Sequence, residues 1–421
     1  MVLKSILYIC PENPYPTDSG DKIRGVGLIR LLAEQFDIDV LCYASAPRVG
    51  GSHIAAIPKG CRIHAIPTGN YKSWRLRLRS LAKRRNNSLL SHADQHFADQ
   101  LSALSTSKSY EYVVVAHSYL GHLLPMLRRL QPSAVLVTDA QNFETDLSRQ
   151  FALTQRSWIR MMYFLLASRW NRRLEKRICR QTDLLFATSE SDAESFRRLS
   201  PKHRGKVYMI PNFVDSRQYE PAVPAEPGIR QKPIIVLPGN MSYFPNVNGA
   251  LYFNESIYPI VKRFIPDIEW HLVGRDCHPS IVAMAANDPS IVVTGYVPDV
   301  GVHVRRASAV IVPLIEGGGT RLKILEAWAY GVPVISTTKG AEGIAYEDGV
   351  DICIADEPHA FANAIVKLTE DRTFARGIAD RALMKLRKLY DRKAVEQKLL
   401  TLFGIDSEVL KDIVSVISST Y

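Results

Sequence analysis

The sequence predicts an α/β protein with two doubly wound parallel sheets. Along its 421 residues, short apolar runs rich in β-branched residues alternate with helical stretches, the pattern of strands joined by crossover helices. A chain of this length exceeds the usual size of one domain. The strand candidates of the first half are Ser5–Cys10, Asp39–Tyr43, Arg62–Ile66, Tyr112–His117, Ala134–Thr138, Asp183–Thr188 and Val207–Ile210. Those of the second half are Ile234–Leu237, Trp270–Val273, Ile291–Thr294, Ala309–Pro313, Pro333–Ser336 and Ile352–Ile354.

The segment between the two halves has the composition of a linker. Four prolines and a glycine cluster with charged residues between Asp215 and Pro233. We therefore expect an N-terminal domain over residues 1–215 and a C-terminal domain over 216–395. A helical tail, 396–421, is expected to pack back on the N-terminal domain. Because open α/β sheets bind ligands at the carboxyl ends of their strands, two such domains are expected to leave a cleft between those ends.

Composition narrows the class of protein. The six cysteines are scattered without a CxxC pair, which suits a reducing compartment such as the cytoplasm. The N-terminal run MVLKSILYIC is too short for a signal peptide, and no window approaches the roughly 18 apolar residues of a membrane span. The formal charge is +11, and residues 1–215 contain 31 Lys and Arg against 18 Asp and Glu. The N-terminal half therefore faces an anionic partner, such as a nucleic acid, a phospholipid surface or a diphosphate, or simply carries a solvated basic face.

Residues 313–334 carry the strongest functional signal of the chain. In PLIEGGGTRLKILEAWAYGVPV, a buried strand leads into three glycines and then into an amphipathic helix. Glycines let a backbone approach a ligand closely, and the start of a helix offers free N–H groups and a positive dipole end, which suit a diphosphate. We expect Thr320 to cap the helix, with Arg321 and Lys323 adding positive charge. Glu326, about one and a half turns into the helix, is placed to accept hydrogen bonds from ribose hydroxyls, unless this is a plain surface helix.

This run resembles the donor-binding signature of the retaining GT-B glycosyltransferases of the group 1, or family-four, type. The segments Pro238–Asn246, Leu272–Arg275 and Thr294–Val297 resemble three further loops of their C-terminal domain, and Ile210–Asp215 resembles the segment that leaves their N-terminal domain. The resemblance implies a GT-B fold, in which two Rossmann-like domains face each other across a cleft. The donor-binding residues that it implies are Gly20, Gly239, Asn240, Gly274, Arg275, Tyr296, Val297, Gly318, Gly319, Thr320, Arg321, Lys323 and Glu326.

The N-terminal half has matching segments of its own. Pro14-Tyr15-Pro16, followed by the run from Gly20 to Arg24, resembles the flexible loop and helix start after the first strand. His117 ends a strand where related enzymes place a histidine against the transferred sugar, so the resemblance assigns it, with Glu326, to the catalytic site. The alternative is a structural histidine at a strand end. By the same resemblance Arg24, Asn142 and Glu144 lie on the acceptor side, although Gln141 stands where a histidine is common.

Two departures from the family pattern affect the donor site. Many relatives carry a second glutamate eight positions before Glu326, and Gly318 occupies that position here. Glu316 lies two residues out of register, so we expect the sugar hydroxyls to be bound from elsewhere, such as the backbone of residues 318–320. The cationic pair that often grips the diphosphate near Gly239 is replaced by Met241, Ser242 and Tyr243. Arg321, Lys323 and backbone amides would then supply the positive charge.

The resemblance implies a metal-independent glycosyltransferase that retains the configuration at the anomeric carbon. Its donor is expected to be a UDP- or GDP-linked sugar, and its acceptor a saccharide or lipid-linked saccharide in bacterial polysaccharide or glycolipid assembly. No separate cofactor, metal or nucleic acid is expected; the sequence has no DxD at a strand end and no aromatic-rich RNA-binding motif. The alternatives are a catalytically inactive or repurposed GT-B protein, either a nucleotide-sugar binder or an epimerase.

Two basic segments raise the possibility of peripheral contact with the inner face of an anionic membrane. Residues 72–85 place Trp74, Leu78 and Leu81 at helical spacing among cations, which suits a helix lying on lipid or an exposed helix packed on its own domain. Trp158, Met162 and Leu165, followed by the basic residues of 172–180, form a similar mixture. For this second segment we expect a long buried crossover helix with a basic end.

Overall fold

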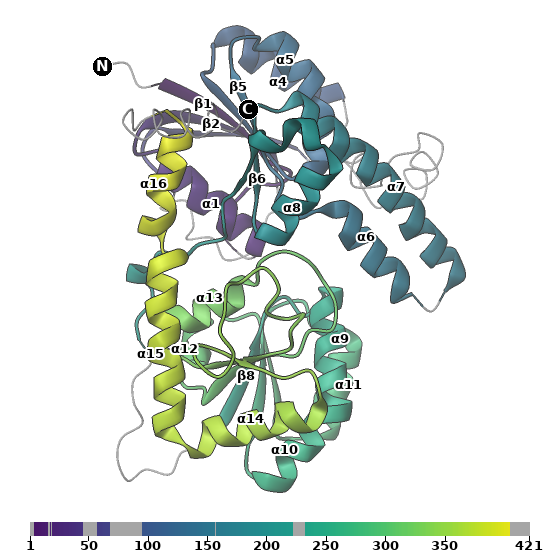
Figure 1. The fold of residues 1–421 in the computed structure, drawn as a ribbon, viewed down its shortest axis with the longest axis vertical. Coiled ribbons are helices and arrows are strands. Elements are labelled where there is room, and N and C mark those ends of the chain that lie inside the picture. Colours follow the sequence, from purple (N-terminus) through teal and green to yellow (C-terminus); the bar gives the residue numbers. More distant parts are fainter. Residues whose placement is uncertain are drawn as a thin grey trace. The chain divides into compact units, whose positions relative to one another are not determined.

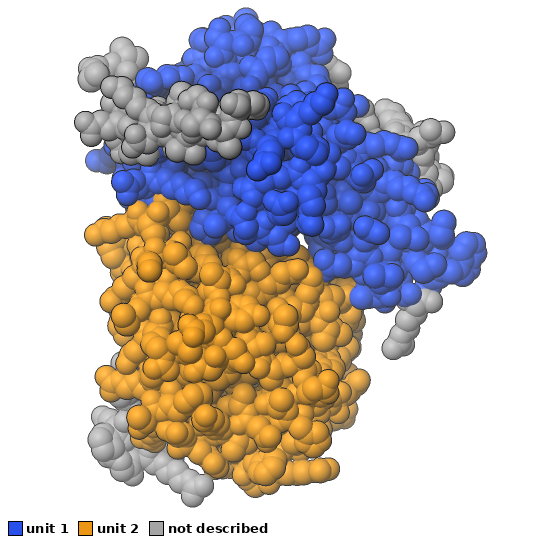
Figure 2. All heavy atoms as spheres, viewed as in Figure 1, with its two compact units in different colours: residues 1–211, 396–421 blue, residues 212–395 orange. Residues whose placement is uncertain are grey.

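The chain folds into two compact units, described separately below. The computed structural model describes residues 4–15, 17, 19–44, 57–67, 95–155, 157–221 and 232–404. The first unit comprises residues 1–211 and 396–421, and the second comprises residues 212–395 (Figure 2). The basic segment 72–85 lies outside the described residues.

The first unit is built on a seven-stranded parallel sheet with the order β3-β2-β1-β4-β5-β6-β7. Helices cover both of its faces (Figure 1). Its strands are β1 (Lys4–Ile9), β2 (Phe36–Tyr43), β3 (Cys61–Ile66), β4 (Tyr112–Ala116), β5 (Val135–Asp139), β6 (Leu184–Ala187) and β7 (Val207–Met209). Its helices are α1 (Gly20–Leu32), α4 (Gln95–Ser107), η2 (Ser118–Leu123), α5 (Leu124–Leu130), α6 (Glu144–Leu153), α7 (Trp158–Gln181), α8 (Glu190–Leu199) and η3 (Pro201–Lys206).

The second unit repeats this architecture with a six-stranded parallel sheet, in the order β10-β9-β8-β11-β12-β13. Its strands are β8 (Ile234–Pro238), β9 (Glu269–Val273), β10 (Ile291–Gly295), β11 (Ala309–Val312), β12 (Val334–Ser336) and β13 (Cys353–Ile354). Its helices are η4 (Ser216–Gln218), α9 (Phe244–Tyr252), η5 (Phe253–Ile257), α10 (Tyr258–Phe264), α11 (Pro279–Asn287), α12 (Gly301–Val304), α13 (Leu322–Ala329), α14 (Pro358–Glu370), α15 (Arg372–Leu389) and the first residues of α16 (Arg392–Leu402).

Two doubly wound parallel sheets were expected, and they are confirmed. Every strand candidate named from the sequence is a strand, and the strand ends differ by at most a few residues. The apolar runs are continuous because strands of a parallel sheet are covered on both faces. The core of β1 shows this directly, since Ile6, Leu7, Tyr8 and Ile9 are all fully buried.

The division between the units falls before Asn212, slightly earlier than the expected end at Asp215. Val214 already belongs to the second unit, because its amide donates to Tyr390 O at 3.0 Å and its carbonyl accepts from Arg392 N at 2.8 Å. Residues 396–404 of the tail belong to the first unit. There Tyr112 Oη donates to Phe403 O at 2.7 Å, and Lys398 Nζ donates to Met209 O at 2.6 Å. Residues 405–421 lie outside the described part.

Candidate functional site

Two glycines bring the ends of neighbouring strands together in the second unit. Gly239 follows β8 and Gly274 follows β9, and Gly239 N donates to Val273 O at 2.9 Å. A Cβ atom on Gly274 would lie 1.8 Å from Gly239 O, and the φ angles of the two glycines are +154° and +147°. No other residue fits such an approach. The strand ends therefore present an open backbone turn, at the edge where α/β sheets bind their ligands.

A chain of amide hydrogen bonds joins this turn to α13. Asn246 Nδ2 donates to Asn240 O at 2.8 Å, and Lys323 Nζ donates to Asn246 Oδ1 at 2.8 Å. A Cβ atom on Gly239 would lie 3.1 Å from Lys323 Nζ, so the ammonium group sits directly beside the glycine turn. The structure thus brings together Gly239, Asn240 and Lys323, which are far apart in the sequence. Asn240 itself accepts from Ser242 N and Oγ, both at 2.8 Å, which fixes the loop.

Lys323 and Glu326 are both destabilised in their charged forms. Burial, together with the neighbouring Arg321 guanidinium, lowers the pKa of Lys323 to about 7, against the opposing effect of Glu326. Burial raises the pKa of Glu326 to about 7, against the opposing effects of the Tyr219 hydroxyl and Lys323. The Tyr219 hydroxyl donates to Glu326 Oε1 at 3.5 Å. Opposite shifts of two neighbouring groups by the same desolvation are typical of sites that bind or transform a charged ligand.

The glycine-rich loop is shaped by Arg321. Its guanidinium donates to Gly318 O, and a Cβ atom on Gly317 would lie 2.7 Å from Arg321 Nη2. Gly317 and Gly319 have φ angles of +114° and +73°. The expectation that Thr320 caps the helix is wrong: α13 begins at Leu322, and Arg321 occupies the N-cap without a side-chain cap. The Thr320 hydroxyl instead donates to Gly343 O at 3.5 Å, and its carbonyl accepts from Asn212 Nδ2 at 3.3 Å.

Glu316, the carboxylate out of register with the family pattern, points into the protein. It is 2% exposed, and its Oε1 accepts from Asn248 Nδ2 of α9 at 2.7 Å. Its Oε2 is buried and has no hydrogen-bond partner within the described part of the chain. A buried carboxylate oxygen without a donor costs about 1–3 kcal/mol or more, so Glu316 Oε2 is an acceptor that the described residues leave unused.

The remaining residues expected to bind the donor lie on the loops after β9 and β10. Arg275 Nε is 3.5 Å from Asp276 Oδ2, and Arg275 O accepts from Met241 N at 2.9 Å, which ties the loop after β9 to the loop after β8. Tyr296 follows Gly295, whose φ is +68°, and its side chain is 66% exposed. Val297 is partly buried. Tyr296 therefore offers an uncovered aromatic face beside the strand ends.

In the first unit a small pocket opens at the carboxyl ends of β1 and β4. His117 follows β4 and adopts a φ of +75°, which a side-chain-bearing residue rarely does. Its ring stacks on Tyr119 with centroids 4.9 Å apart, and its Nε2 is 3.8 Å from Asp21 Oδ2. Such backbone strain clusters at functional sites. The pocket is lined by Tyr8, Cys10, Pro11, Glu12, Pro14, Asp21, Lys22, Gly25, Ala116, His117 and Gln141.

Arg24, expected on the acceptor side, is held by partners within the first unit. Gly20 is the first residue of α1, and Arg24 lies one turn later with its side chain 1% exposed. Its Nη2 donates to Asp139 Oδ1 at 2.6 Å, its Nε to Asp139 Oδ2 at 2.9 Å, and its Nη1 to Pro211 O at 3.0 Å. A bidentate pair this deeply buried holds α1 against β5 and the end of the unit. The structure therefore shows internal partners for Arg24, and its acceptor-side role stays a prediction.

Asn142 and Glu144 lie at the start of α6, close to the positive-φ residue Gln141 (φ +52°). Burial raises the pKa of Glu144 to about 7, while a hydrogen bond from the Asn142 side chain opposes the shift. The backbone N of Glu144 donates to the buried Glu175 Oε1 at 2.6 Å. This end of α6 therefore holds a titratable carboxyl group near neutral pH.

Sequence reasoning missed several partners of the site. Tyr219, Asn246 and Asn248 hold Glu326, Lys323 and Glu316, and Asp21 lies beside His117. Asn246 belongs to a motif that the sequence singled out, but its role did not follow from the motif. Within the described residues, no cluster of three or more His, Cys, Asp or Glu side chains could hold a metal ion. None of the helices in the described part of the chain combines the length and the hydropathy needed to cross a membrane.

Family models account for most of the chain. Residues 26–218 match the model described as Glycosyltransferase Family 4, and residues 232–371 match the model described as Glycosyl transferases group 1. The two matches correspond to the two units, in the order of the GT-B enzymes. The chain is a GT-B glycosyltransferase.

Solved structures of GT-B proteins share the fold of this glycosyltransferase. It is similar to sucrose-phosphate synthase from Thermosynechococcus elongatus, with a TM-score of 0.70 and 18% identity over 95% of this chain and 98% of that one. It is also similar to HepE from Anabaena, solved in complex with UDP-glucose, with a TM-score of 0.67 and 13% identity over 95% and 99% of the two chains. TarM gives a TM-score of 0.66 at 10% identity, over 96% and 99%.

A relative of this glycosyltransferase is an uncharacterised 44.6 kDa protein in the cps region of Klebsiella pneumoniae. The two are 23% identical over 168 residues, which is 38% of this chain and 43% of the relative. The matched part thus spans less than half the length of that relative.

Proposed function

We propose that this protein transfers a sugar from a UDP- or GDP-linked donor to a saccharide or lipid-linked saccharide, with retention at the anomeric carbon. The observation that carries the proposal is the pairing of Lys323 and Glu326 on α13, beside the glycine turn at Gly239. Burial brings the pKa of both side chains to about 7. A ligand with a diphosphate and hydroxyl donors would stabilise the charged form of each side chain.

The nucleotide part of the donor would bind at the strand ends of the second unit. Lys323 would face the diphosphate, together with backbone N–H groups of the first turn of α13 and of the loop at Gly239. Glu326 would accept hydrogen bonds from the ribose hydroxyls, with the Tyr219 hydroxyl holding its carboxylate. Arg275 and Tyr296, on the neighbouring loops, would border the base. The family's separate cationic pair is absent here, so Lys323 carries a larger share of the charge.

The sugar of the donor would be held by the glycine-rich loop. Gly318 lacks the carboxylate of many relatives, whereas the backbone of Gly318–Thr320 is open to hydrogen bonds. Glu316 adds a buried oxygen, Oε2, that has no donor among the described residues. A sugar hydroxyl or an ordered water that reached it would offset its desolvation cost. We propose that this arrangement replaces the missing glutamate.

The first unit would present the acceptor and His117 to the sugar. During transfer, the bond between the anomeric carbon and the β-phosphate oxygen breaks, and a bond to the acceptor oxygen forms on the same face of the sugar. The acceptor proton passes to the departing phosphate, which Lys323 and the dipole of α13 stabilise as charge develops on it. Glu144, with a pKa of about 7, lies on the acceptor side of the same unit. No side chain is assigned as a covalent nucleophile.

Known proteins of similar fold support a nucleotide-sugar donor and a saccharide acceptor. HepE was solved with UDP-glucose, and a TarM structure contains UDP together with a glycosylated glycerol. The Klebsiella pneumoniae relative lies in a cps region, which supports a place in bacterial polysaccharide assembly. The loss of the first motif glutamate at Gly318 favours one alternative, a nucleotide-sugar binder without transferase activity.

The His117→Asn variant distinguishes transfer from binding. His117 lies in the first unit, so the variant should keep nucleoside diphosphate affinity within about twofold while transfer or donor hydrolysis falls by about 10²-fold or more. His96→Asn, at an exposed position on α4, is the matched control and should leave both quantities unchanged. If wild-type protein binds the diphosphate but neither transfers nor hydrolyses any donor, the inactive-binder alternative holds. If His117→Asn loses both binding and activity and its melting temperature falls, His117 is a structural residue.

A further inference from the structure

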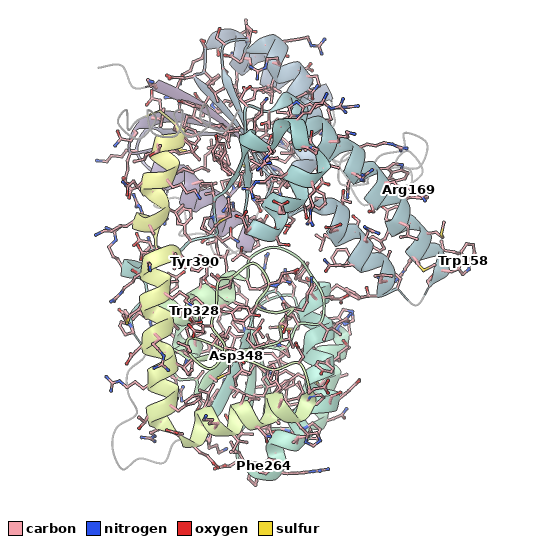
Figure 3. All side chains as sticks on the ribbon, viewed as in Figure 1. Trp158, Arg169, Phe264, Trp328, Asp348 and Tyr390 are labelled. Atoms are coloured by element: carbon pink, nitrogen blue, oxygen red, sulfur yellow. The ribbon has the colours of Figure 1, made fainter. Side chains whose placement is uncertain are left out.

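The tip of the α6–α7 hairpin exposes a cluster of large apolar side chains. Leu153 is 83% exposed, Trp158 71%, Ile159 63% and Met162 43%. Met161, Tyr163, Phe164, Leu165 and Leu166, the next residues of α7, are only partly buried. Figure 3 shows Trp158 at the far end of the hairpin. The sequence-based expectation of a buried crossover helix is therefore wrong for the first turns of α7, because the helix extends beyond the body of its unit.

The hairpin is held firmly at its base, so the tip is a preformed feature. Glu175, fully buried on α7, accepts from Glu144 N and from Thr145 Oγ1 at the start of α6. Asn171 Nδ2 donates to Ser148 Oγ at 2.9 Å, and Ser168 Oγ donates to Thr145 O at 2.9 Å. Further toward the tip, Phe151 and Phe164 pack edge to face with ring centroids 5.7 Å apart.

Along the outer face of α7, the exposed side chains are mainly apolar near the tip, with Arg160 among them, and cationic further along. After Met162, the side chains of Ala167, Trp170 and Leu174 turn inward and are buried. The residues that remain exposed on this part of the helix are all cationic: Arg169, Arg172, Arg173, Lys176, Arg177 and Arg180. Arg169 lies further along α7 than Trp158, away from the tip of the hairpin (Figure 3). Residues 144–181 contain nine Lys and Arg and three Asp and Glu.

We propose that this hairpin tip inserts into the surface of an anionic lipid bilayer. Trp158, Ile159 and Met162 would enter the boundary between headgroups and acyl chains, where an indole ring is favoured. The arginines behind them, Arg169, Arg172 and Arg173, would then lie at the level of the lipid phosphates. An apolar tip followed by a row of cations matches the two layers of such a surface in order. A second copy of the chain fits less well, because a tip-to-tip contact brings two rows of arginines together.

The proposal goes beyond the transferase reaction and is independent of which sugar is moved. It also assigns the membrane contact to a different segment from residues 72–85, the first basic run that the sequence pointed to. Its test therefore measures lipid binding by the full chain and follows nucleotide binding separately.

The test is partition of the full chain between buffer and vesicles, measured by flotation. Vesicles of equimolar phosphatidylglycerol and phosphatidylcholine should bind the wild-type protein, and vesicles of phosphatidylcholine alone should bind it far more weakly. The triple variant Trp158→Ser, Ile159→Ser, Met162→Ser should bind the anionic vesicles at least about tenfold more weakly. Each of Arg169→Gln and Arg173→Gln should weaken binding by about fivefold, and added salt should do the same.

A matched control removes exposed apolar side chains elsewhere. Phe264→Ser with Met384→Ser alters two residues of the second unit that are 58% and 68% exposed, and this pair should leave vesicle binding unchanged. A cooperative thermal transition with the wild-type midpoint reports that the fold of each variant is intact. Unchanged vesicle binding by the Trp158, Ile159 and Met162 variant would overturn the proposal. So would a wild-type dimer that the same variant dissociates while its binding to lipid stays at the wild-type level.

Discussion

Among single residues, Lys323 is expected to link nucleotide binding at the proposed donor site to pH. Its pKa is about 7 in the free protein because burial disfavours the ammonium form. A bound diphosphate favours that form, so the pKa rises on binding and the protein takes up a proton. As pH rises above 7 the free protein loses this proton, and binding must restore it. Affinity for UDP or GDP should therefore fall with increasing pH, by up to about tenfold per unit.

Calorimetry checks this prediction at pH 8 in two buffers with different heats of ionisation. The observed binding enthalpies should differ by the amount that corresponds to an uptake of up to one proton. Lys323→Met should abolish the difference and most of the affinity, whereas Lys339→Met, on a loop of the same unit, should preserve both. Equal enthalpies in the two buffers for wild-type protein would show that Lys323 does not face the diphosphate.

Contiguous motifs made part of the site predictable. Lys323, Glu326 and the glycines stand in one run of sequence, and the sequence identified them together. Their partners did not follow, because Tyr219 lies 107 residues from Glu326 and Asn246 lies 77 residues from Lys323. Arg24 shows the same limit: its partner Asp139 is 115 residues away, and nothing in the local pattern indicates a buried ion pair.

At the scale of elements, the end of α16 is part of the core of the first unit. Phe403 is 1% exposed, and its ring lies 4.7 Å from that of Tyr112 and 6.0 Å from that of Phe36. Phe403→Ala should lower the free energy of unfolding by about 3–5 kcal/mol, because it leaves a cavity among packed rings. Chemical denaturation followed by circular dichroism measures this change. An effect below about 1 kcal/mol, comparable to that of the exposed Leu389→Ala, would mean that the tail only rests on the surface.

The strands were predictable because buried parallel strands form continuous apolar runs between turn residues. The ends of helices were less so. Thr320 has the side chain of an N-cap, but its hydroxyl bonds to Gly343 O, and Arg321 takes the cap position. The length of α7 was visible in the sequence, whereas the exposure of its first turns was not. Apolar residues such as Trp158 and Ile159 indicate burial by default. Only the fold shows where a helix extends beyond the core.

In the whole molecule, the candidate sites are divided between two units of the same architecture. The second unit holds the glycine turn, Lys323 and Glu326, and its charge is close to neutral. The first unit holds the strained His117, the pocket beside it and the basic hairpin. The asymmetry of charge was readable from the sequence, which placed the basic excess in residues 1–215. That part of this basic excess lies on the outer face of α7 could be seen only in the structure.

The proposed function requires that the second unit binds the nucleotide of a sugar donor at α13. Titration of UDP and GDP into wild-type protein and Glu326→Gln, followed by calorimetry at pH 8, tests this binding. Because the folded pKa of Glu326 is about 7, above its ordinary value of 4.5, burial of the ionised carboxylate lowers stability at this pH. Glu326→Gln should therefore melt no lower than wild type.

One of the two nucleotides should bind wild-type protein, and Glu326→Gln should weaken that binding by about tenfold or more through loss of charge-assisted hydrogen bonds to the ribose. Glu370→Gln, an exposed exchange on α14, should bind like wild type. Unchanged affinity in Glu326→Gln, or a lowered melting temperature with affinity intact, would make Glu326 a structural residue and would contradict the proposed donor site.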